Sequence, residues 1–291
     1  MKRHKSPRNI EEVLREAAAL LEAQGISSAR LDAELLLAGA LGRDRVFLYR
    51  ERDRAVGPET LEKYRKLIGR RQTGEPVAYL LGGKEFWSLD FFVDPRVLIP
   101  RPETEVLIEE VLHRFSGRSR EPLFFLDVGT GSGILAVVLA GVFPASRVAA
   151  SDISRDALRV AVKNAKRHGV ADRVSFLLGD MLHPVKGSFD GIVSNPPYIG
   201  AALYGDLERD IRDFEPAGAL LAGREGIAYH EILIDRGIHC LKPGGWLFME
   251  LGEGQGTRIG ELFDRSGGYE SFSLRKDYGG RDRVITARKR G

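Results

Sequence analysis

Apolar residues recur with helical spacing in the N-terminal part of the chain. From Val13 to Leu21 they follow one another at intervals of three and four residues, as in a helix with one buried face, and the glycine of "QGIS" ends that segment. Similar helices are predicted over 28–41 and from Pro58 through "ETLEKYRKLIGRRQ". Three short helices predict a small domain over residues 1–73, serving either substrate recognition or only packing and dimerisation.

The pattern changes in residues 74–100. This segment is rich in aromatic and β-branched residues and is interrupted by Gly82-Gly83 and by "VDP", which is typical of short strands joined by turns. We therefore predict a β-hairpin linker here. Pro102 then lies near the first turn of another helix, whose beginning carries acidic side chains.

From residue 122 onward, continuous apolar runs alternate with helical patterns. This alternation predicts an α/β fold, in which a parallel sheet is covered by helices on both faces, within a domain spanning residues 101–291. Two strands with no helix between them follow in "YESFSLRKDYGGRDRVITARK", and they are expected to pair antiparallel at the sheet edge. The predicted strands are 123–128, 147–152, 174–178, 189–194 and 244–251, and the predicted helices are near 132–142, 154–168, 224–241 and 255–266.

Composition and charge argue against several classes of protein. No apolar run approaches the ~20 residues of a membrane span. The single cysteine, Cys240, rules out an internal disulfide and suits a reducing cytoplasm, and the scattered histidines give no support for a metal site. Lys and Arg outnumber Asp and Glu by only 17 to 14 in residues 1–90 and equal them at 27 each in 91–291. No direct contact with nucleic acid is expected, because such contact needs a concentrated basic face.

A glycine-rich turn in "LDVGTGSGILAVVLA" follows the first strand of the predicted sheet. Gly129, Gly131 and Gly133 allow a tight turn and a close approach to a ligand at the start of a helix. The next strand ends in Asp152, 152 − 133 = 19 residues after the last glycine, near the ~20 expected for an acid that binds ribose hydroxyls. Asp152 could instead cap the following helix. A carboxylate there disfavours NADP and leaves NAD or S-adenosylmethionine.

The third strand of the sheet ends in "GD" at 179–180, followed by Met181. These side chains could hold the adenine end of either cofactor, although Asp180 could also be an ordinary turn residue.

The fourth strand ends in "SNPPYIG", where two prolines stand between Asn195 and Tyr198. Prolines end a strand because they donate no ladder hydrogen bond, and they also fix the backbone angles of the segment. Ligands of open α/β sheets bind at the carboxyl ends of the strands. The loop is therefore predicted to lie beside the cofactor site.

The glycine turn, Asp152, Asp180 and "NPPY" occur in the order of class I methyltransferases that alkylate amide or exocyclic amino nitrogens. "LIPRPETE", "FEPAGALLAGREGIAYH", "LKPGG" and "DYGGRDRV" narrow this likeness, and the chain from about residue 10 to 288 resembles the bacterial release-factor glutamine N5-methyltransferases. The resemblance implies a Rossmann-like sheet of order 3-2-1-4-5-7-6 with an antiparallel last strand. It also implies S-adenosylmethionine as methyl donor and the Gln of the Gly-Gly-Gln motif of class I peptide-chain release factors as substrate.

The resemblance assigns roles to particular residues, and the chemistry of an amide fits them. An amide nitrogen is a poor nucleophile because its lone pair is delocalised into the carbonyl group. Hydrogen-bond acceptors placed around the NH2 group can orient that lone pair and stabilise positive charge on the nitrogen. The expected substrate and catalytic residues are Asn195 through Oδ1, Pro196 through its carbonyl, Pro197, and Tyr198 through its ring; the expected cofactor residues are Gly129, Thr130, Gly131, Ser132, Gly133, Asp152, Asp180, Met181 and Asn195.

Two other functions use the same motifs. A DNA adenine-N6 methyltransferase shares the "NPPY" acceptor logic, but it must flip its base and usually has a basic recognition region. A cofactor-bound adaptor that activates another methyltransferase would need neither an intact "NPPY" nor an intact glycine turn. The sequence therefore favours the protein methyltransferase.

Overall fold

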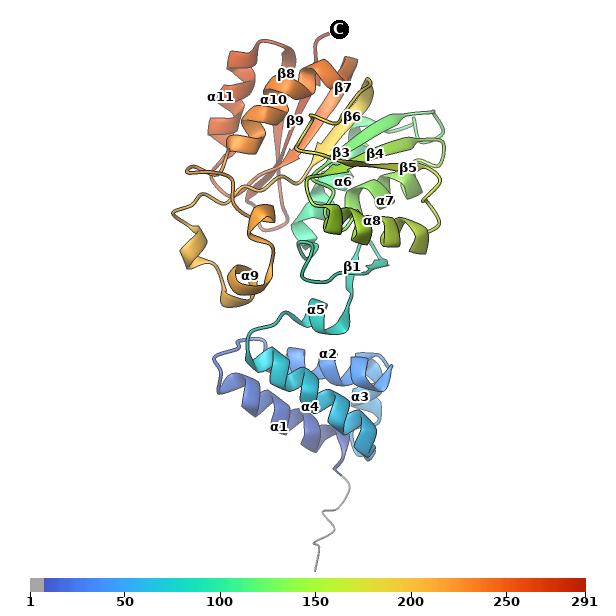
Figure 1. The fold of residues 1–291 in the computed structure, drawn as a ribbon, viewed down its shortest axis with the longest axis vertical. Coiled ribbons are helices and arrows are strands. Elements are labelled where there is room, and N and C mark those ends of the chain that lie inside the picture. Colours follow the sequence, from blue (N-terminus) through green and yellow to red (C-terminus); the bar gives the residue numbers. More distant parts are fainter. Residues whose placement is uncertain (1–7) are drawn as a thin grey trace, which may run out of the picture. The chain divides into compact units, whose positions relative to one another are not determined.

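A computed structural model of the chain describes residues 8–291, and these form two compact units (Figure 1). The first, called here the N-terminal unit, contains the described residues up to Gly82 together with Glu208–Phe214. The second, the sheet unit, contains Gly83–Leu207 and Glu215–Gly291. Each unit has its own apolar core.

The N-terminal unit is helical. Asn9 begins its first helix with a capping box, in which Asn9 and Glu12 each accept a hydrogen bond from the other's backbone N–H. The three long helices correspond to those predicted from the sequence, whereas the short helices were not predicted. The elements are α1 (Ile10–Glu22), α2 (Ala29–Leu41), α3 (Arg45–Arg50), α4 (Pro58–Gln72), α5 (Val77–Leu81) and α9 (Arg209–Phe214).

A buried arginine connects distant parts of the N-terminal unit. The Arg71 guanidinium lies 2.7 Å from the Asp32 carboxylate and donates a hydrogen bond to the carbonyl of Gly74. Asp210, from the distant helix α9, lies 3.7 Å from the same guanidinium. These contacts explain why a segment far along the chain folds with the N-terminal helices.

The segment 74–100, predicted as a β-hairpin linker, contains strands only in β1 (Lys84–Phe86) and β2 (Leu89–Phe91). Before them, Val77–Leu81 form helix α5, which the sequence analysis did not predict. Pro76 stands at the N-cap of this helix, and Gly82 ends it in the left-handed conformation. Proline and glycine in these places favour a helical turn over an extended chain, and they outweigh the apolar composition of the segment.

The sheet unit contains a seven-stranded sheet of order β5-β4-β3-β6-β7-β9-β8, which is the predicted order 3-2-1-4-5-7-6. Its first five strands along the chain pair in parallel, and β8 and β9 pair antiparallel at one end of the sheet, as predicted. The strands are β3 (Phe124–Val128), β4 (Arg147–Asp152), β5 (Val174–Leu178), β6 (Phe189–Ser194), β7 (Leu241–Glu250), β8 (Tyr269–Lys276) and β9 (Asp282–Lys289).

Helices cover both faces of this sheet (Figure 1). Neighbouring residues of one strand point to opposite sides, so Phe125 packs in the core on one face and Leu126 in the core on the other. Buried side chains of α6 (Glu105–Arg114), α7 (Ile134–Val142) and α8 (Arg155–Arg167) fill the first core. The second core contains buried side chains of α10 (Ala228–Cys240) and α11 (Gly256–Ser266).

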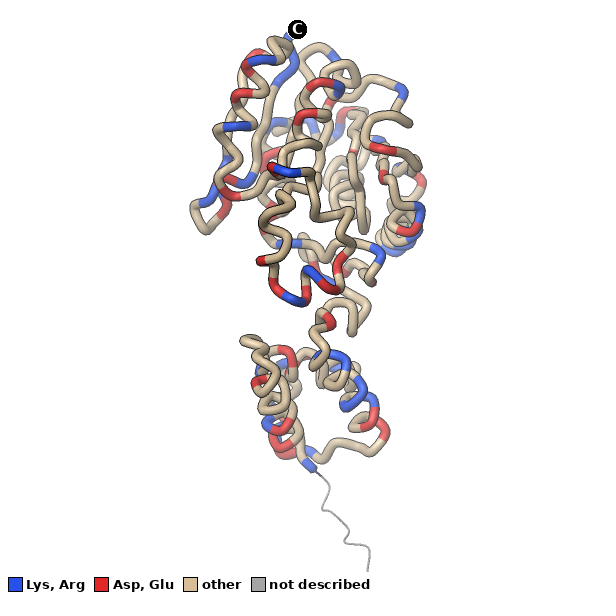
Figure 2. The backbone as a smooth tube through the Cα atoms, turned by 60° about the vertical axis from the view of Figure 1, so that its left-hand side comes forward, with Lys and Arg blue, Asp and Glu red and all other residues tan. Residues whose placement is uncertain are grey.

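Acidic and basic residues are interspersed along the backbone of each unit (Figure 2). The N-terminal unit pairs many of its cations internally: Glu34, for example, accepts hydrogen bonds from both Arg30 and Arg45. Among residues 8–291, no helix has the length and apolar character needed to cross a membrane.

Candidate functional site

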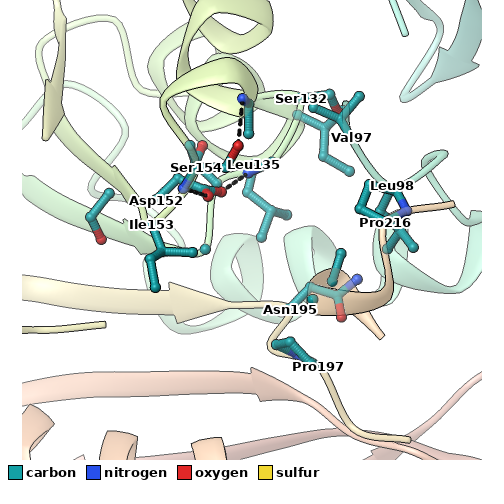
Figure 3. A pocket seen from close by; sticks show the side chains of 18 of the residues that line it. Val97, Leu98, Ser132, Leu135, Asp152, Ile153, Ser154, Asn195, Pro197 and Pro216 are labelled. Atoms are coloured by element: carbon teal, nitrogen blue, oxygen red, sulfur yellow. Dashed lines mark hydrogen bonds between the residues drawn. The ribbon is translucent and has the colours of Figure 1, made fainter. Parts of the chain in front are cut away.

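A pocket opens in the sheet unit at the carboxyl ends of β3, β4, β5 and β6. The chain runs from β3 outward through β4 and β5 and then returns to place β6 on the other side of β3, so the pocket lies where the strand order reverses. In Figure 3, Asp152 and Ile153 lie on one side of the pocket and Asn195 and Pro197 on the other. The predicted site residues that line it are Gly129, Thr130, Gly131, Ser132, Asp152, Asp180, Met181, Asn195 and Pro197.

The glycine-rich turn adopts the backbone conformation for which its glycines are suited. Gly129, Gly131 and Gly133 have φ angles of 72°, 54° and 84°. A Cβ atom at Gly129 or Gly131 would meet no atom within 4 Å, because these residues face the open pocket. Gly133 differs: it is the N-cap of α7, and a Cβ there would lie 3.0 Å from the Cβ of Ala161. Its role in the structure is close packing of helices rather than lining of the pocket.

Asp152 joins two loops of the pocket. Its Oδ2 accepts a hydrogen bond from the Gly131 N–H at 2.8 Å, and its Oδ1 accepts one from the Ser154 N–H at 2.8 Å. The N-cap of α8 is Ser154, whose hydroxyl accepts from the Ala157 N–H, so Asp152 is not the helix cap. Burial raises the pKa of the Asp152 carboxyl above its ordinary value. Its place on the pocket wall leaves the carboxylate available to ligand hydroxyls.

Asp180 and Met181 form the part of the pocket wall that follows β5. Asp180 is exposed to solvent, and Met181 is half-buried with a φ of 48°, a conformation uncommon for a residue with a side chain. The Ser151 hydroxyl donates to the Met181 carbonyl at 3.4 Å and thereby links this turn to the end of β4. Both residues are brought to the same pocket as the glycine turn.

The loop after β6 presents Asn195 to the pocket. Its Nδ2 donates a hydrogen bond to the hydroxyl of Thr104 at 3.1 Å. Thr104 is fully buried in the "RPETE" segment, so this bond fixes which end of the Asn195 amide faces the protein. Asn195 also lines the pocket.

The remaining residues of "NPPY" are placed differently from one another. Pro197 lines the pocket, but Pro196 and Tyr198 are not among the described residues that line it. Pro196 is buried, and the Tyr198 hydroxyl donates to the carboxyl of Glu250 at 3.2 Å. Burial raises the pKa of this phenol above its ordinary value, so Tyr198 stays protonated.

Two buried acids near the pocket were not predicted as site residues. Asp127 in β3 accepts hydrogen bonds from the Thr130 hydroxyl at 2.6 Å and from the Ala136 N–H, and burial raises its pKa to about 7. Glu250 ends β7 and is also fully buried; burial raises its pKa to about 7 against the opposing effects of Thr104, Arg283 and Tyr198. In the sequence, Asp127 and Glu250 each stand as a single acidic residue within an apolar strand, and this signal could have indicated them.

The pocket fits a nucleoside-containing cofactor. It combines a glycine turn with an open backbone, just before the N-terminus of α7, with a carboxylate at the end of the neighbouring strand. Among residues 8–291, the Oδ1 atom of Asp127 beneath the turn is buried without a hydrogen-bond partner. These groups suit the ribose and the polar end of such a molecule.

The fold and the pocket define the class of protein, which is that of the methyltransferases. A model of the methyltransferase small domain matches residues 102–206. Solved structures support the same fold. A methyltransferase from Pyrococcus furiosus is 22% identical and has a TM-score of 0.52, covering 72% of this chain and 92% of its own. The 16S rRNA methyltransferase RsmC of T. thermophilus with AdoMet and guanosine is 19% identical with a TM-score of 0.55, covering 72% of this chain and 50% of its own.

Full-length relatives give the family. The release factor glutamine methyltransferase of Geobacter sulfurreducens is 41% identical over 280 residues, which cover 96% of each chain. That of Nitratidesulfovibrio vulgaris is 42% identical over 284 residues, 96% of this chain and 95% of its own. The PrmC N-terminal domain model matches residues 12–82. The chain therefore belongs to the release factor glutamine methyltransferase family, which supports the protein methyltransferase over the DNA methyltransferase.

Proposed function

We propose that the protein transfers a methyl group from S-adenosylmethionine to the side-chain amide nitrogen, N5, of the Gln in the Gly-Gly-Gln motif of class I peptide-chain release factors. Membership of the family supports the reaction. The observation that supports it in the structure is the place of Asn195, which lines the pocket and donates its Nδ2 hydrogen bond to Thr104.

The residues proposed to hold the cofactor lie in the glycine turn, at the end of β4 and in the turn after β5. With S-adenosylmethionine bound, the backbone of residues 129–132 would lie beside its methionine end and ribose, the Asp152 carboxylate would accept hydrogen bonds from the ribose hydroxyls, and Asp180 with Met181 would contact the adenine end. When bound, S-adenosylmethionine supplies a methyl group attached to a positively charged sulfur.

The NPPY loop prepares the substrate amide. Asn195 Oδ1 and the Pro196 carbonyl accept hydrogen bonds from the two N–H groups of the glutamine side chain, which turns the nitrogen lone pair toward the donor. These dipoles are fixed before the reaction, so they stabilise positive charge on the nitrogen without reorganising. No general base is required before the methyl transfer, because an alkylated amide nitrogen is strongly acidic and loses its proton afterwards. Pro197 and Tyr198 complete the slot for the planar amide.

The N-terminal unit is proposed to recognise the release factor. Its separate core and its match to the PrmC N-terminal domain model support a dedicated role. Its mixed charges support a protein partner over a nucleic acid or a membrane surface (Figure 2). The proposed location is the cytoplasm, in keeping with the single cysteine.

The test is a labelling experiment with S-adenosylmethionine that carries a labelled methyl group. The full chain is incubated with a purified release factor, with the same factor carrying Ala in place of the motif Gln, and with duplex DNA. We expect label in the first protein alone. Label in DNA but not in the release factor would overturn the proposal, and equal label in both release factors would place the modification at another residue.

A further inference from the structure

Glu250 is an acidic residue at the end of β7, where the neighbouring residues are apolar. Its neighbours Phe248, Met249 and Leu251 are fully buried, and Glu250 itself is 0% exposed. A buried carboxyl group is costly, and an apolar residue of similar size at such a site is often as stable or more stable. A residue that breaks the local pattern in this way is a candidate for a functional role.

The carboxyl group of Glu250 contacts the NPPY loop at its aromatic end. Tyr198 donates its phenolic hydrogen bond to Oε1 at 3.2 Å, so the ring is fixed from the interior of the protein. Gln255, a few residues after Glu250, donates through Nε2 to the Tyr198 carbonyl at 2.9 Å. Tyr198 is therefore held at its ring by the last residue of β7 and at its backbone by the segment that follows this strand.

We propose that Glu250 is a positioning residue for methyl transfer, which fixes the ring of Tyr198 in the NPPY loop. The inference rests on the proposed function, in which the Tyr198 ring completes the slot for the substrate amide. Glu250 does not touch the substrate. Its removal releases the Tyr198 ring and leaves the glycine turn, Asp152 and the cofactor contacts in place.

The test compares E250L, E250Q and the control variant E110Q. Glu110 is another buried glutamate of the sheet unit, and it bonds to Arg114 and Arg275 rather than to the NPPY loop. With release factor as substrate, E250L is expected to lower kcat about 100-fold, the effect of misplacing a reacting group by an ångström. E250Q, which keeps an oxygen for Tyr198, recovers at least part of that loss, and E110Q leaves kcat within about twofold of the parent.

Cofactor affinity and thermal unfolding distinguish positioning from a general structural effect. E250L is expected to bind S-adenosylhomocysteine within about threefold of the parent affinity and to melt no lower than E110Q. A loss of affinity in parallel with kcat, or an unchanged kcat in E250L, would overturn the proposal.

A further readout does not require activity. The aromatic ring signals of Tyr198 in a sample with 13C-labelled tyrosine, identified by their absence in Y198F, are expected to shift in E250L but not in E110Q. Unchanged signals in E250L contradict the proposal even if no substrate is methylated. Failure of the parent protein to methylate any release factor, with the signals shifted as expected, instead contradicts the proposed function alone.

Discussion

The two sides of the pocket are built in different ways. On the proposed cofactor side, Gly129 and Gly131 expose backbone without a side chain to the pocket. Asp152 accepts hydrogen bonds there from backbone N–H groups of nearby loops. On the acceptor side, Asn195 and Tyr198 are held by the side chains of Thr104 and Glu250, which come from distant parts of the chain. In the proposed function, cofactor binding therefore depends on local backbone shape, and orientation of the substrate amide depends on buried side chains from distant parts of the chain.

The largest effect is expected from a substitution of Asn195, which tests the acceptor side of the pocket separately from the cofactor side. N195A removes one acceptor for the substrate amide and is expected to lower kcat by about 100- to 1000-fold, as for other preorganised groups at a developing charge. Affinity for S-adenosylhomocysteine, measured by calorimetry, is expected to change little. Retention of kcat would contradict the acceptor role, and a parallel loss of affinity would assign Asn195 to the cofactor side.

The reverse pattern is expected at Asp152. D152A removes the acceptor proposed for ribose hydroxyls and is expected to weaken cofactor binding by about 10- to 100-fold, the cost of a lost hydrogen bond to a charged group. At saturating cofactor, kcat is expected to stay near that of the parent. Unchanged affinity in the same calorimetric titration would limit Asp152 to its bonds with Gly131 and Ser154.

A smaller effect on stability is expected at Gly133. In G133A, the added methyl group meets Ala161 at 3.0 Å and the residue keeps a positive φ, which together are expected to cost about 1–3 kcal/mol in the free energy of unfolding. Gly141, within α7, is the matched control, because a Cβ there meets nothing within 4 Å. Chemical denaturation should show loss in G133A and no loss in G141A. Equal stability of G133A and G141A would contradict the packing role of Gly133.

An effect on stability that varies with pH is expected from Glu250. Burial raises its pKa to about 7 from an ordinary value of 4.5, so between these values the native state binds a proton that the unfolded state has lost. Stability contributed by this proton falls as the pH rises from 4.5 to 7. The melting temperature of E250Q relative to the parent should therefore rise by a few degrees across that window. A constant difference would show that Glu250 does not titrate there.

The sequence predicted the sheet, and it placed the glycine turn and Asp152 at one edge of that sheet, because these signals are local. Strand periodicity, the glycine turn and the spacing to Asp152 all lie within one stretch of chain, and the observed strand order agrees with the one implied by the family resemblance. The helix cap was less predictable. Asp152 and Ser154 both suit an N-cap, and only the backbone geometry assigns the cap to Ser154.

The acceptor side could be predicted only in part. "NPPY" indicated the loop, but Thr104 is 91 residues from Asn195 and Glu250 is 52 residues from Tyr198, so no local pattern connects them. The same limit applies to the helix Arg209–Phe214, which folds with the N-terminal unit through contacts such as that between Asp210 and Arg71. Contacts over such separations are decided by packing, which periodicity does not report.

The orientation of Asn195 is tested most directly by a crystal structure of the protein with S-adenosylhomocysteine and a Gly-Gly-Gln peptide. We expect Asn195 Oδ1 about 3 Å from the side-chain nitrogen of the peptide Gln, with Nδ2 still bonded to Thr104. A structure in which Oδ1 faces away from the peptide, into solvent or the protein interior, would contradict the acceptor mechanism.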